Sequence, residues 1–462
     1  MQTARFDVDI ALLQKYNRPG PRYTSYPTAP HFHEGYGEAD FRADIALANE
    51  AGTDISLYMH LPFCHSLCYF CGCNMIVTRN TDRVAHYLTY LKREIASVAA
   101  LLDPARRVSQ LHWGGGTPTY LQPDQIRDLF GYIRDHFTFS EGAEISLEID
   151  PRRLSDDHLP ALREVGFNRV SFGVQDIHAE VQEAINRIQP LELNAKVIRD
   201  SRELGFDSIN VDLIYGLPHQ SVASYAETLE AIIALDPDRL AVFNYAHVPW
   251  LKKHQNVLPE AAMPKTGERL EMLKLIIERL TEAGYAYIGM DHFAKPDDTL
   301  TQALRSHTLY RNFQGYSTHS QAEVFAMGIT GISQLRNAYA QNVKTTGDYE
   351  AALDGGGLPI AEGIRLNADD QLRRYVITEL MCNNRVLKDR VQERYGVDFD
   401  SYFPDHAERL RPFIEDGLVT LASDRIQVSE AGRLVIRNIA MNFDAYLDLP
   451  VEGAKPIYSR TV

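Results

Sequence analysis

Four cysteines lie in one short stretch of the sequence, HLPFCHSLCYFCGCN (60–74), and their thiolates could bind a metal centre. They are Cys64, Cys68, Cys71 and Cys73, and the fifth cysteine, Cys382, lies far from them. Thiolates this close together can converge on one soft centre. The C-x3-C-x2-C spacing supplies three sulfurs from a loop that is too short to reach across a domain. This suits three corners of a cubane iron–sulfur cluster and leaves the fourth iron without a protein ligand.

Other interpretations of the four cysteines compete with the cluster. A structural zinc site usually takes two well-separated pairs of ligands rather than four thiolates in one loop. An apolar core has no need of four sulfurs so close together. Disulfides are disfavoured if the protein is cytosolic, because that compartment keeps thiols reduced. The cluster is therefore the favoured interpretation, with zinc as the alternative.

An iron with an open position can hold the amino and carboxylate groups of S-adenosylmethionine. An electron from the cluster then breaks a carbon–sulfur bond of this cofactor and releases a 5′-deoxyadenosyl radical. The C-x3-C-x2-C motif, with the aromatic Phe70 just before its last cysteine, resembles the radical S-adenosylmethionine (radical SAM) superfamily. The resemblance implies radical chemistry at this loop.

Length and charge limit the remaining function classes. The 462 residues can form two or three domains with full cores. The net charge of −15 argues against nucleic acid or an anionic membrane as partner, because both need an exposed basic face. No apolar run is long enough to cross a bilayer, and the first residues, MQTARFDVDIALLQKYN, do not read as a signal peptide. We therefore expect a cytoplasmic protein.

Short apolar runs alternate with segments of helical periodicity between residues 53 and 345. Six of the runs read as strands, at 55–61, 109–115, 145–149, 169–174, 209–216 and 239–245. A βα repeat of this kind predicts an α/β fold, and six strands indicate a partial (β/α)6 TIM-like barrel rather than a closed eight-stranded one. Parallel barrels carry their chemistry at the carboxyl ends of the strands, so the cysteine loop is in the expected place.

Polar and glycine residues mark the ends of the later strands. Singly each is ordinary, but together they form one rim with acceptors for ribose hydroxyls and an ammonium, and a cation for a carboxylate. The glycine run also lets the backbone approach a ligand closely. The rim consists of Gly114–Gly115–Gly116–Thr117–Pro118, Glu148 and Asp150, Gln175 and Asp176, Asp212 and Arg187. His60 and His292 are either core histidines or substrate contacts.

The segments on either side of the barrel have separate roles. Residues 1–52 form an N-terminal arm, with a short helix over 9–16 and then a proline-rich irregular stretch in which cations alternate with tyrosines. The tyrosines either pack on the main domain or place the cations, such as Arg22, over the active site to attract an anionic substrate. Residues 346–462 read as a mainly helical, winged-helix-like domain with a hairpin turning at Ser423–Asp424. In so acidic a protein this domain is expected to pack against the barrel rather than bind DNA.

Motifs along nearly the whole chain resemble the bacterial oxygen-independent coproporphyrinogen III oxidases. They are PRYTSYPTA in the arm, CYFCGC, LHWGGGTPTYL, SLEIDP, NRVSFGVQD, NVDLIYGLP, FNYAH, GMDHFA and NFQGY, all in the same order. The resemblance implies one [4Fe–4S] cluster held by Cys64, Cys68 and Cys71, with Cys73 not a ligand. It also implies two S-adenosylmethionine molecules. Contacts to the cluster-bound one are Tyr58, Phe70, Gly115, Glu148 and Ile332, and contacts to the second are Gly116, Thr117, Gln175, Arg187, Asp212 and Ala246.

The reaction implied by this resemblance belongs to haem biosynthesis and needs no oxygen. It converts the propionates on rings A and B of coproporphyrinogen III into vinyl groups and gives protoporphyrinogen IX. Tyr58 and Arg22 are the expected catalytic residues, with Arg22 facing the substrate carboxylates. We also expect a monomer that receives electrons from a reductase or a flavodoxin-type protein.

Three rivals differ from this expectation. A haem-trafficking chaperone of the same superfamily generally lacks the fourth cysteine and the arm, both of which this chain has. A radical methyltransferase would use two S-adenosylmethionine molecules on another substrate. A non-catalytic cysteine-rich protein would bind metal without cleaving S-adenosylmethionine.

Overall fold

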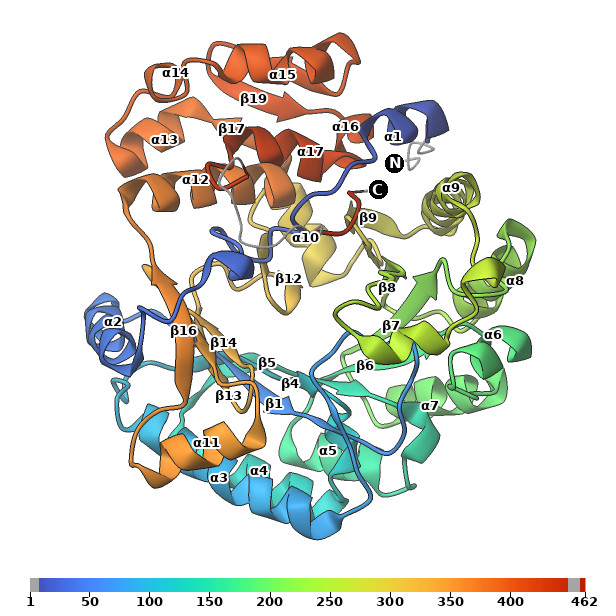
Figure 1. Ribbon diagram of the computed structural model, residues 1–462, viewed down its shortest axis with the longest axis vertical. Coiled ribbons are helices and arrows are strands. Elements are labelled where there is room, and N and C mark those ends of the chain that lie inside the picture. Colours follow the sequence, from blue (N-terminus) through green and yellow to red (C-terminus); the bar gives the residue numbers. More distant parts are fainter. Residues whose placement is uncertain (1–7, 448–457, 462) are drawn as a thin grey trace.

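The structure is a computed structural model that describes residues 8–447 and 458–461 (Figure 1). Its central element is a β-sheet whose middle strands are parallel. Six parallel strands lie side by side in chain order. They are β1 (Ile55–Leu61), β4 (Val108–Gly115), β5 (Phe139–Ile149), β6 (Arg169–Gln175), β7 (Ser208–Tyr215) and β8 (Arg239–Asn244). All six predicted strands are confirmed. In β5 and β6 buried apolar residues alternate with polar residues, so one face of these strands packs in the core and the other carries polar side chains.

Helices on the outside of the curved sheet follow each of these strands (Figure 1). They are α3 (Thr81–Ala99), α4 (Pro123–His136), α5 (His158–Val165), α6 (Ala179–Ala184), α7 (Leu191–Glu203), α8 (Val222–Ala234) and α9 (Thr266–Glu282). Helix α3 illustrates how the sequence determines the start and the buried face of these helices. The Asn80 side chain accepts from the first free N–H groups at its start, and Val84, Leu88, Leu91 and Ile95 form the buried stripe that packs on the sheet.

The sheet extends beyond the six central strands on both sides. β13 (Glu323–Met327) pairs parallel to β1, and β14 (Ile332–Gln334), β15 (Ala338–Asn342) and β16 (Ile360–Arg365) follow antiparallel. On the other side lie the antiparallel β10 (His292–Ala294) and β9 (Ala286–Gly289). β16 and β9 are the two edges of this sheet, so the barrel is partial. The sheet also runs past residue 345, at which we expected the barrel to end.

Shorter elements fill the gaps around the barrel. The cysteine loop contains β2 (Phe63–Cys64) and β3 (Ile76–Val77), which pair with each other. β11 (Tyr310–Asn312) and β12 (Gly315–Ser317) form a hairpin. The remaining helices around the sheet are α2 (Glu38–Ala51), α10 (Thr299–Ser306) and α11 (Thr346–Asp354). None of the helices within the described ranges is both long and apolar enough to cross a membrane.

The C-terminal elements pack at one end of the molecule (Figure 1). They begin with α12 (Ala368–Thr378), which continues as a π-helical turn over Glu379–Asn383. A three-stranded sheet of β17 (Arg385–Leu387), β19 (Arg425–Val428) and β18 (Val419–Leu421) packs with α13 (Lys388–Tyr395), α14 (Phe399–Tyr402) and α15 (His406–Glu415). β18 and β19 form the predicted hairpin around Ser423–Asp424. Two short helices, α16 (Glu430–Arg433) and α17 (Ile436–Ala440), complete this winged-helix-like unit.

The N-terminal arm packs on the C-terminal unit. Its helix α1 (Ile10–Tyr16) is capped by Asp9, and Tyr16 stacks on Phe413 of α15. Tyr23 and Tyr26 are also buried, and they contact Asp444 and Tyr446, so the tyrosines pack mainly on the C-terminal unit rather than on the barrel. The arm also meets the last residues of the chain, because Pro19 and Arg460 form an isolated β-bridge.

Candidate functional site

The cysteine loop leaves the barrel at the carboxyl end of β1 and is held by backbone hydrogen bonds. The N–H of Ile76 donates to the carbonyl of Pro62 at 2.6 Å, and the N–H of Cys71 donates to that of Cys68 at 3.1 Å. Cys64 and Cys71 are half-buried, Cys68 is buried and Cys73 is exposed. The loop therefore presents its thiols at the catalytic end of the barrel.

Positive and polar donors surround the sulfur atoms. The Cys68 Sγ accepts from Arg152 Nη2 at 3.3 Å and from Arg187 Nη1 at 3.6 Å. The Cys64 Sγ lies 3.7 Å from Thr117 Oγ1. Such donors stabilise thiolates, the form in which cysteine binds iron. This donor set fits an iron–sulfur cluster.

The thiols also influence one another. Burial, together with the neighbouring Cys71 and Cys68, raises the pKa of Cys64 to about 12, although the hydrogen bond with Thr117 lowers it. A hydrogen bond from the Cys73 thiol lowers the pKa of Cys71, while the pKa of Cys73 itself is raised. In the described part of the chain, no three Cys, His, Asp or Glu side chains lie close enough together to hold a single metal ion.

Arg187 lies beneath the loop, in contact with another predicted rim residue. Its Nη1 lies 3.3 Å from Asp150 Oδ2, and its Nη2 donates to the carbonyl of Gly173 at 2.6 Å. Arg152 Nη2 also contacts Asp150, at 2.6 Å. Burial opposes ionisation of Asp150, but the two guanidinium groups outweigh it and lower the pKa to about 2. In this structure Arg187 therefore pairs with a carboxylate of the chain itself.

The glycine run at the end of β4 packs against the cysteine loop. Gly115 has a φ of +114°, and a Cβ there would lie 2.6 Å from His60 Cε1. A Cβ at Gly116 would lie 2.5 Å from the carbonyl oxygen of Pro62. The N–H groups of Gly116 and Thr117 donate to carbonyls of the 61–63 segment, both at 2.9 Å. The close approach that requires glycine is thus to the chain itself, and ligand contacts from this run stay a prediction.

Three of the predicted cofactor contacts share one cavity inside the barrel, of about 220 Å³. They are Tyr58, Glu148 and Ile332. Burial opposes ionisation of Glu148, but a hydrogen bond and the charge of His112 lower its pKa below the usual value. The Tyr58 hydroxyl lies 3.2 Å from His60 Nδ1.

His112 is part of the lining of this cavity but was not identified from the sequence. It lies two positions before the glycine run, so it is on the same face of β4 as position 114. Phe313 and Gln314, which form another part of the lining, belong to the NFQGY motif, to which the sequence analysis gave no specific role.

Asp212 and Gln175 lie on the next two strands. Asp212 accepts from Ser171 Oγ at 2.9 Å and from Asn210 Nδ2 at 2.7 Å. Burial, helped by the charge of Glu148, raises its pKa to about 6. Gln175 is buried and has a φ of +70°, an uncommon conformation for a residue with a side chain. Asp176 has a structural role, because it is fully buried and accepts from Gln220 Nε2 at 2.7 Å.

The remaining predicted residues lie elsewhere around the rim. Phe70 packs against an apolar cluster that contains Val181 and Ile185. Ala246 and Arg22 line a separate cavity of about 420 Å³ beyond the ends of β7 and β8, where Arg22 forms an ion pair with Asp291. The sequence left two possible roles for His60 and His292, and the surroundings of these two histidines differ. His60 Nε2 lies 3.0 Å from the carbonyl oxygen of Asn74, whereas burial lowers the pKa of His292 to about 3.

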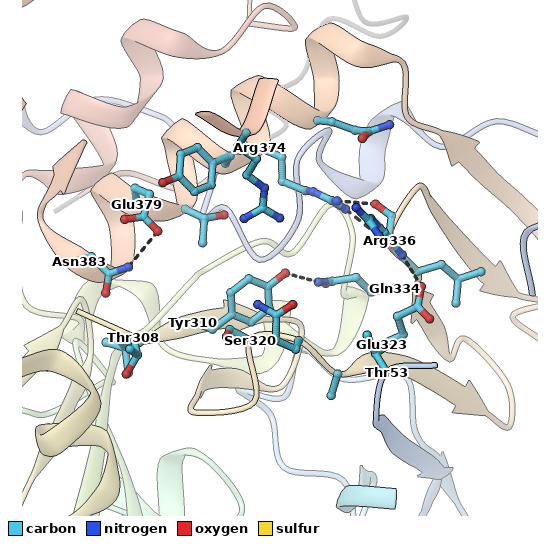
Figure 2. Close-up of a pocket in the computed structure, with 18 of the residues that line it drawn as sticks. Thr53, Thr308, Tyr310, Ser320, Glu323, Gln334, Arg336, Arg374, Glu379 and Asn383 are labelled. Carbon is cyan, nitrogen blue, oxygen red and sulfur yellow. Dashed lines mark hydrogen bonds between the residues drawn. The ribbon is translucent and has the colours of Figure 1, made fainter. Parts of the chain in front are cut away.

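Figure 2 shows a third cavity, of about 360 Å³, between the amino-terminal ends of β1 and β13 and helix α12. Arg374 points into it and donates to the carbonyl of Arg336, and the N–H of Arg336 donates to Glu323 at 2.6 Å. Asn383 Nδ2 donates to Glu379 at 3.1 Å. The charged and polar groups that line this cavity thus mostly form hydrogen bonds with one another. The cavity lies at the opposite ends of the strands from the cysteine loop.

The fold and the cysteine-bearing rim define a radical SAM protein. Residues 58–232 match the family model of the radical SAM superfamily, and residues 366–435 match that of the HemN C-terminal domain. The chain belongs to the family of oxygen-independent coproporphyrinogen III oxidases, as the following similarities show.

Two curated relatives named oxygen-independent coproporphyrinogen III oxidase match almost end to end. The protein from Synechocystis is 48% identical over 455 residues, which cover 98% of this chain and 97% of the relative. The protein from Escherichia coli K12 is 47% identical over 447 residues, 97% of each chain. The solved structure of coproporphyrinogen III oxidase (HemN) from Escherichia coli, described as a radical SAM enzyme, superposes with a TM-score of 0.92 at 46% identity. It covers 96% of this chain and 100% of that one. A [4Fe–4S] cluster and S-adenosylmethionine follow from membership of this superfamily.

Proposed function

We propose that this chain is an oxidoreductase that converts the ring A and ring B propionates of coproporphyrinogen III into vinyl groups and gives protoporphyrinogen IX. The observation that carries the proposal is the rim itself. Three thiols in C-x3-C-x2-C spacing, with guanidinium donors on Cys68, stand at the carboxyl ends of the strands. The near end-to-end similarity to relatives named for this activity supports the substrate.

The reaction needs a radical because of the substrate's chemistry. A propionate β-hydrogen on unactivated carbon is too weak an acid for any side-chain base to remove. The cluster and S-adenosylmethionine supply, when bound, a 5′-deoxyadenosyl radical that takes this hydrogen atom. Loss of CO2 and of one electron to an acceptor then leaves the vinyl group.

We assign one cluster to Cys64, Cys68 and Cys71, with Cys73 outside the ligand set. The thiolate-stabilising contacts of Arg152, Arg187 and Thr117 support this assignment. Cys73 is the exposed member of the four, which supports its separate role.

We further assign two S-adenosylmethionine molecules to the rim. For the cluster-bound molecule, the shared cavity of Tyr58, Glu148 and Ile332 is the support, because Glu148 is ionised near neutral pH and can accept from hydroxyl or ammonium groups. Phe70 and Gly115 complete its contacts. For the second molecule the proposed contacts are Gly116, Thr117, Gln175, Arg187, Asp212 and Ala246. Asp212 has the best support among them, as a buried carboxylate near Glu148.

The remaining assignments concern the setting of the enzyme. The chain acts as a monomer in the cytoplasm, and a reductase or a flavodoxin-type protein supplies electrons to its cluster. Size-exclusion chromatography with light scattering tests the first point. Reduction of the reconstituted cluster by purified flavodoxin and its reductase tests the last.

The decisive experiment is a product assay on the reconstituted enzyme, under anaerobic and reducing conditions, with coproporphyrinogen III. We expect CO2, 5′-deoxyadenosine and a product with two vinyl groups. Cleavage of S-adenosylmethionine with a methylated product would indicate the methyltransferase instead. Transfer of haem without turnover would indicate the chaperone, and no cleavage of S-adenosylmethionine would indicate a non-catalytic metal-binding protein.

A further inference from the structure

The cavity of about 420 Å³ beyond the ends of β7 and β8 carries an unusual excess of positive charge. Its lining contains five arginines and a single carboxylate, that of Asp291. The arginines are Arg22, Arg269, Arg433, Arg437 and Arg460. The chain as a whole has 62 acidic and 47 basic residues, so this concentration runs against its overall charge.

Three of the five arginines have no ion pair with a carboxylate among the residues that the structure describes. Asp291 pairs with Arg22. Within the described residues, Arg269, Arg437 and Arg460 form no ion pair with an acidic side chain and instead donate to neutral oxygens. Arg269 Nη2 donates to the carbonyl of Tyr245 at 2.8 Å, and Arg460 Nη1 donates to that of Asn17 at 3.1 Å. Arg437 is buried and Arg269 is half-buried, and cations without a counter-charge are costly when they are withdrawn from water, so the cavity favours an anionic ligand.

Arg437 is the structural member of the group. It is buried, and its Nε donates to the carbonyl of Pro21 at 2.8 Å while its Nη1 donates to that of Arg460 at 3.0 Å. Burial, together with the charges of Arg22 and Arg311, lowers its pKa to about 9. Because all its donors bind backbone oxygens of the arm and of the last residues, Arg437 positions these two segments rather than binding a ligand.

Arg269 and Arg460 retain donors for a ligand. No hydrogen bond inside the described structure uses Nε or Nη1 of Arg269, and Arg460 is exposed and uses only Nη1. They approach the cavity from different elements, since Arg269 belongs to α9 and Arg460 to the described segment 458–461. Two guanidinium groups on different walls can bind two separate carboxylates.

Apolar side chains share the cavity with the arginines. Trp250 is 43% exposed and Leu251 is 67% exposed, an unusual exposure for large apolar side chains. Leu273 and Ile277 of α9 continue the apolar wall. A ligand that covers these side chains and also reaches the arginines must combine an apolar ring surface with acidic groups at its edge.

We propose that this cavity binds propionate carboxylates of the tetrapyrrole substrate, with Arg269 and Arg460 as their direct partners and Trp250 against the ring system. The proposal rests on the proposed function. The cavity includes Asn244 and Ala246, at the same strand ends as the cysteine loop, and because Ala246 is also a proposed contact of the second S-adenosylmethionine, the substrate site adjoins that of the cofactor. It would anchor the far side of the substrate while a propionate nearer to Glu148 reacts.

Binding of coproporphyrin III, the air-stable tetracarboxylate form of the substrate skeleton, tests the proposal on the full-length protein. Equilibrium dialysis gives its Kd, and the part of the fluorescence quenching that Trp250→Phe removes reports binding beside Trp250. We expect about a tenfold higher Kd for Arg269→Gln and for Arg460→Gln. Arg269→Lys, which keeps the charge, recovers part of this loss. Protoporphyrin IX, with two carboxylates, binds the parent protein more weakly than coproporphyrin III.

Arg336→Gln is the matched control, since Arg336 lines the cavity of Figure 2 and has no place in the binding site. It should leave the Kd unchanged. In turnover, Arg269→Gln and Arg460→Gln should raise KM for coproporphyrinogen III with little change in kcat, because they remove binding that is equal in ground and transition states.

The possible outcomes separate the two proposals. If the parent enzyme produces protoporphyrinogen IX and both glutamine variants, folded by circular dichroism, bind coproporphyrin III as the parent does, the cavity assignment is wrong and the proposed function stands. If the parent neither binds coproporphyrin III nor turns over its reduced form, the proposed function fails and this inference fails with it.

Discussion

At the scale of single residues, the cysteine loop was the most predictable feature of the chain. Ligand type and spacing can be read directly from the sequence, so the proposal of Cys64, Cys68 and Cys71 as ligands required no tertiary information. Tyr58, Glu148 and Ile332 required the family resemblance, and the structure brings them to one cavity. Arg269 and Arg460 have no local signal, because they meet only after elements distant in sequence have packed together.

The ligand assignment makes a direct prediction about the four cysteines of the loop. After anaerobic reconstitution, Cys64→Ser, Cys68→Ser and Cys71→Ser should each lose the cluster and all turnover, because a cubane with two thiolate ligands is poorly held. Cys73→Ser should keep both iron and sulfide. Iron and acid-labile sulfide analysis measures this, and loss of iron from Cys73→Ser would contradict the assignment.

Asp212 should make binding of S-adenosylmethionine sensitive to pH. Its pKa of about 6 lies above the ordinary value because the side chain is buried near Glu148. As the pH falls below 6 the carboxylate becomes protonated and attracts the cationic cofactor less. A drop from pH 7.5 to 5.5 should weaken binding about fourfold.

Isothermal titration of S-adenosylmethionine into reconstituted enzyme at several pH values measures this effect. Asp212→Asn should bind more weakly and lose this part of the pH dependence. An unchanged pH profile in the variant would assign the titration to another group.

At the scale of elements, the prediction succeeded where the hydrophobic pattern was long. All six central strands and helices such as α3 and α9 were recognisable from pattern alone, because each carries several apolar residues with a single periodicity. The short antiparallel strands at the sheet edges were missed. β10 and β14 have three residues each, too few to establish an alternation, and they depend on pairing with neighbours.

The boundary of the C-terminal unit shows the same limit. β16 completes the main sheet and ends at Arg365, and the HemN C-terminal match begins at residue 366. We propose that the unit begins there rather than at 346. The strand could not be assigned to the barrel from sequence, because its register partner β15 was not recognised as a strand.

Helix α3 is tied to the sheet by a buried carboxylate, which gives a prediction for stability. Glu94 accepts from the N–H of Gly328 at 2.7 Å, from Asn342 Nδ2 at 2.7 Å and from the hydroxyl of Tyr349. Burial raises its pKa to about 7 despite these bonds. The folded state therefore holds a proton that the unfolded state releases above about pH 4.5. The stabilisation from this proton is complete below pH 4.5 and is lost as the pH rises through 7.

Replacing Glu94 should remove this pH dependence. Between pH 5 and pH 8 the free energy of unfolding of the parent should fall relative to that of Glu94→Gln by about 3 kcal/mol. Denaturant unfolding at a series of pH values measures the difference. Glu192→Gln, at an exposed position of α7, is the control and should follow the parent. Parallel curves for parent and Glu94→Gln would contradict the prediction.

At the scale of the whole molecule, the arm, the barrel and the C-terminal unit meet at one cavity. Arg437 holds the arm there through the carbonyls of Gly20 and Pro21. Arg437→Gln should leave these carbonyls without partners and weaken docking of the arm by about 2–4 kcal/mol. Trypsin should then cut after Lys15 and Arg22 at least ten times faster, while the rest of the chain resists.

The rate of loss of intact protein on a gel, with the cleavage sites identified by mass spectrometry, tests this prediction. Arg336→Gln again serves as the control, because its side chain has no contact with the arm. Equal digestion of Arg437→Gln and the parent would show that the tyrosines alone hold the arm in place.

The meeting of the two chain ends has a consequence for folding. The N–H of Arg18 donates to Thr461 Oγ1 across 443 positions of sequence, and the backbone of Thr461 donates back to the carbonyl of Arg18. Contacts between such distant segments close the largest loop in the chain and are expected to form late. A molecule whose barrel had already assembled, with its cysteines in place, would still lack two walls of the arginine cavity. Its iron site could thus mature before the molecule was able to enclose a tetrapyrrole.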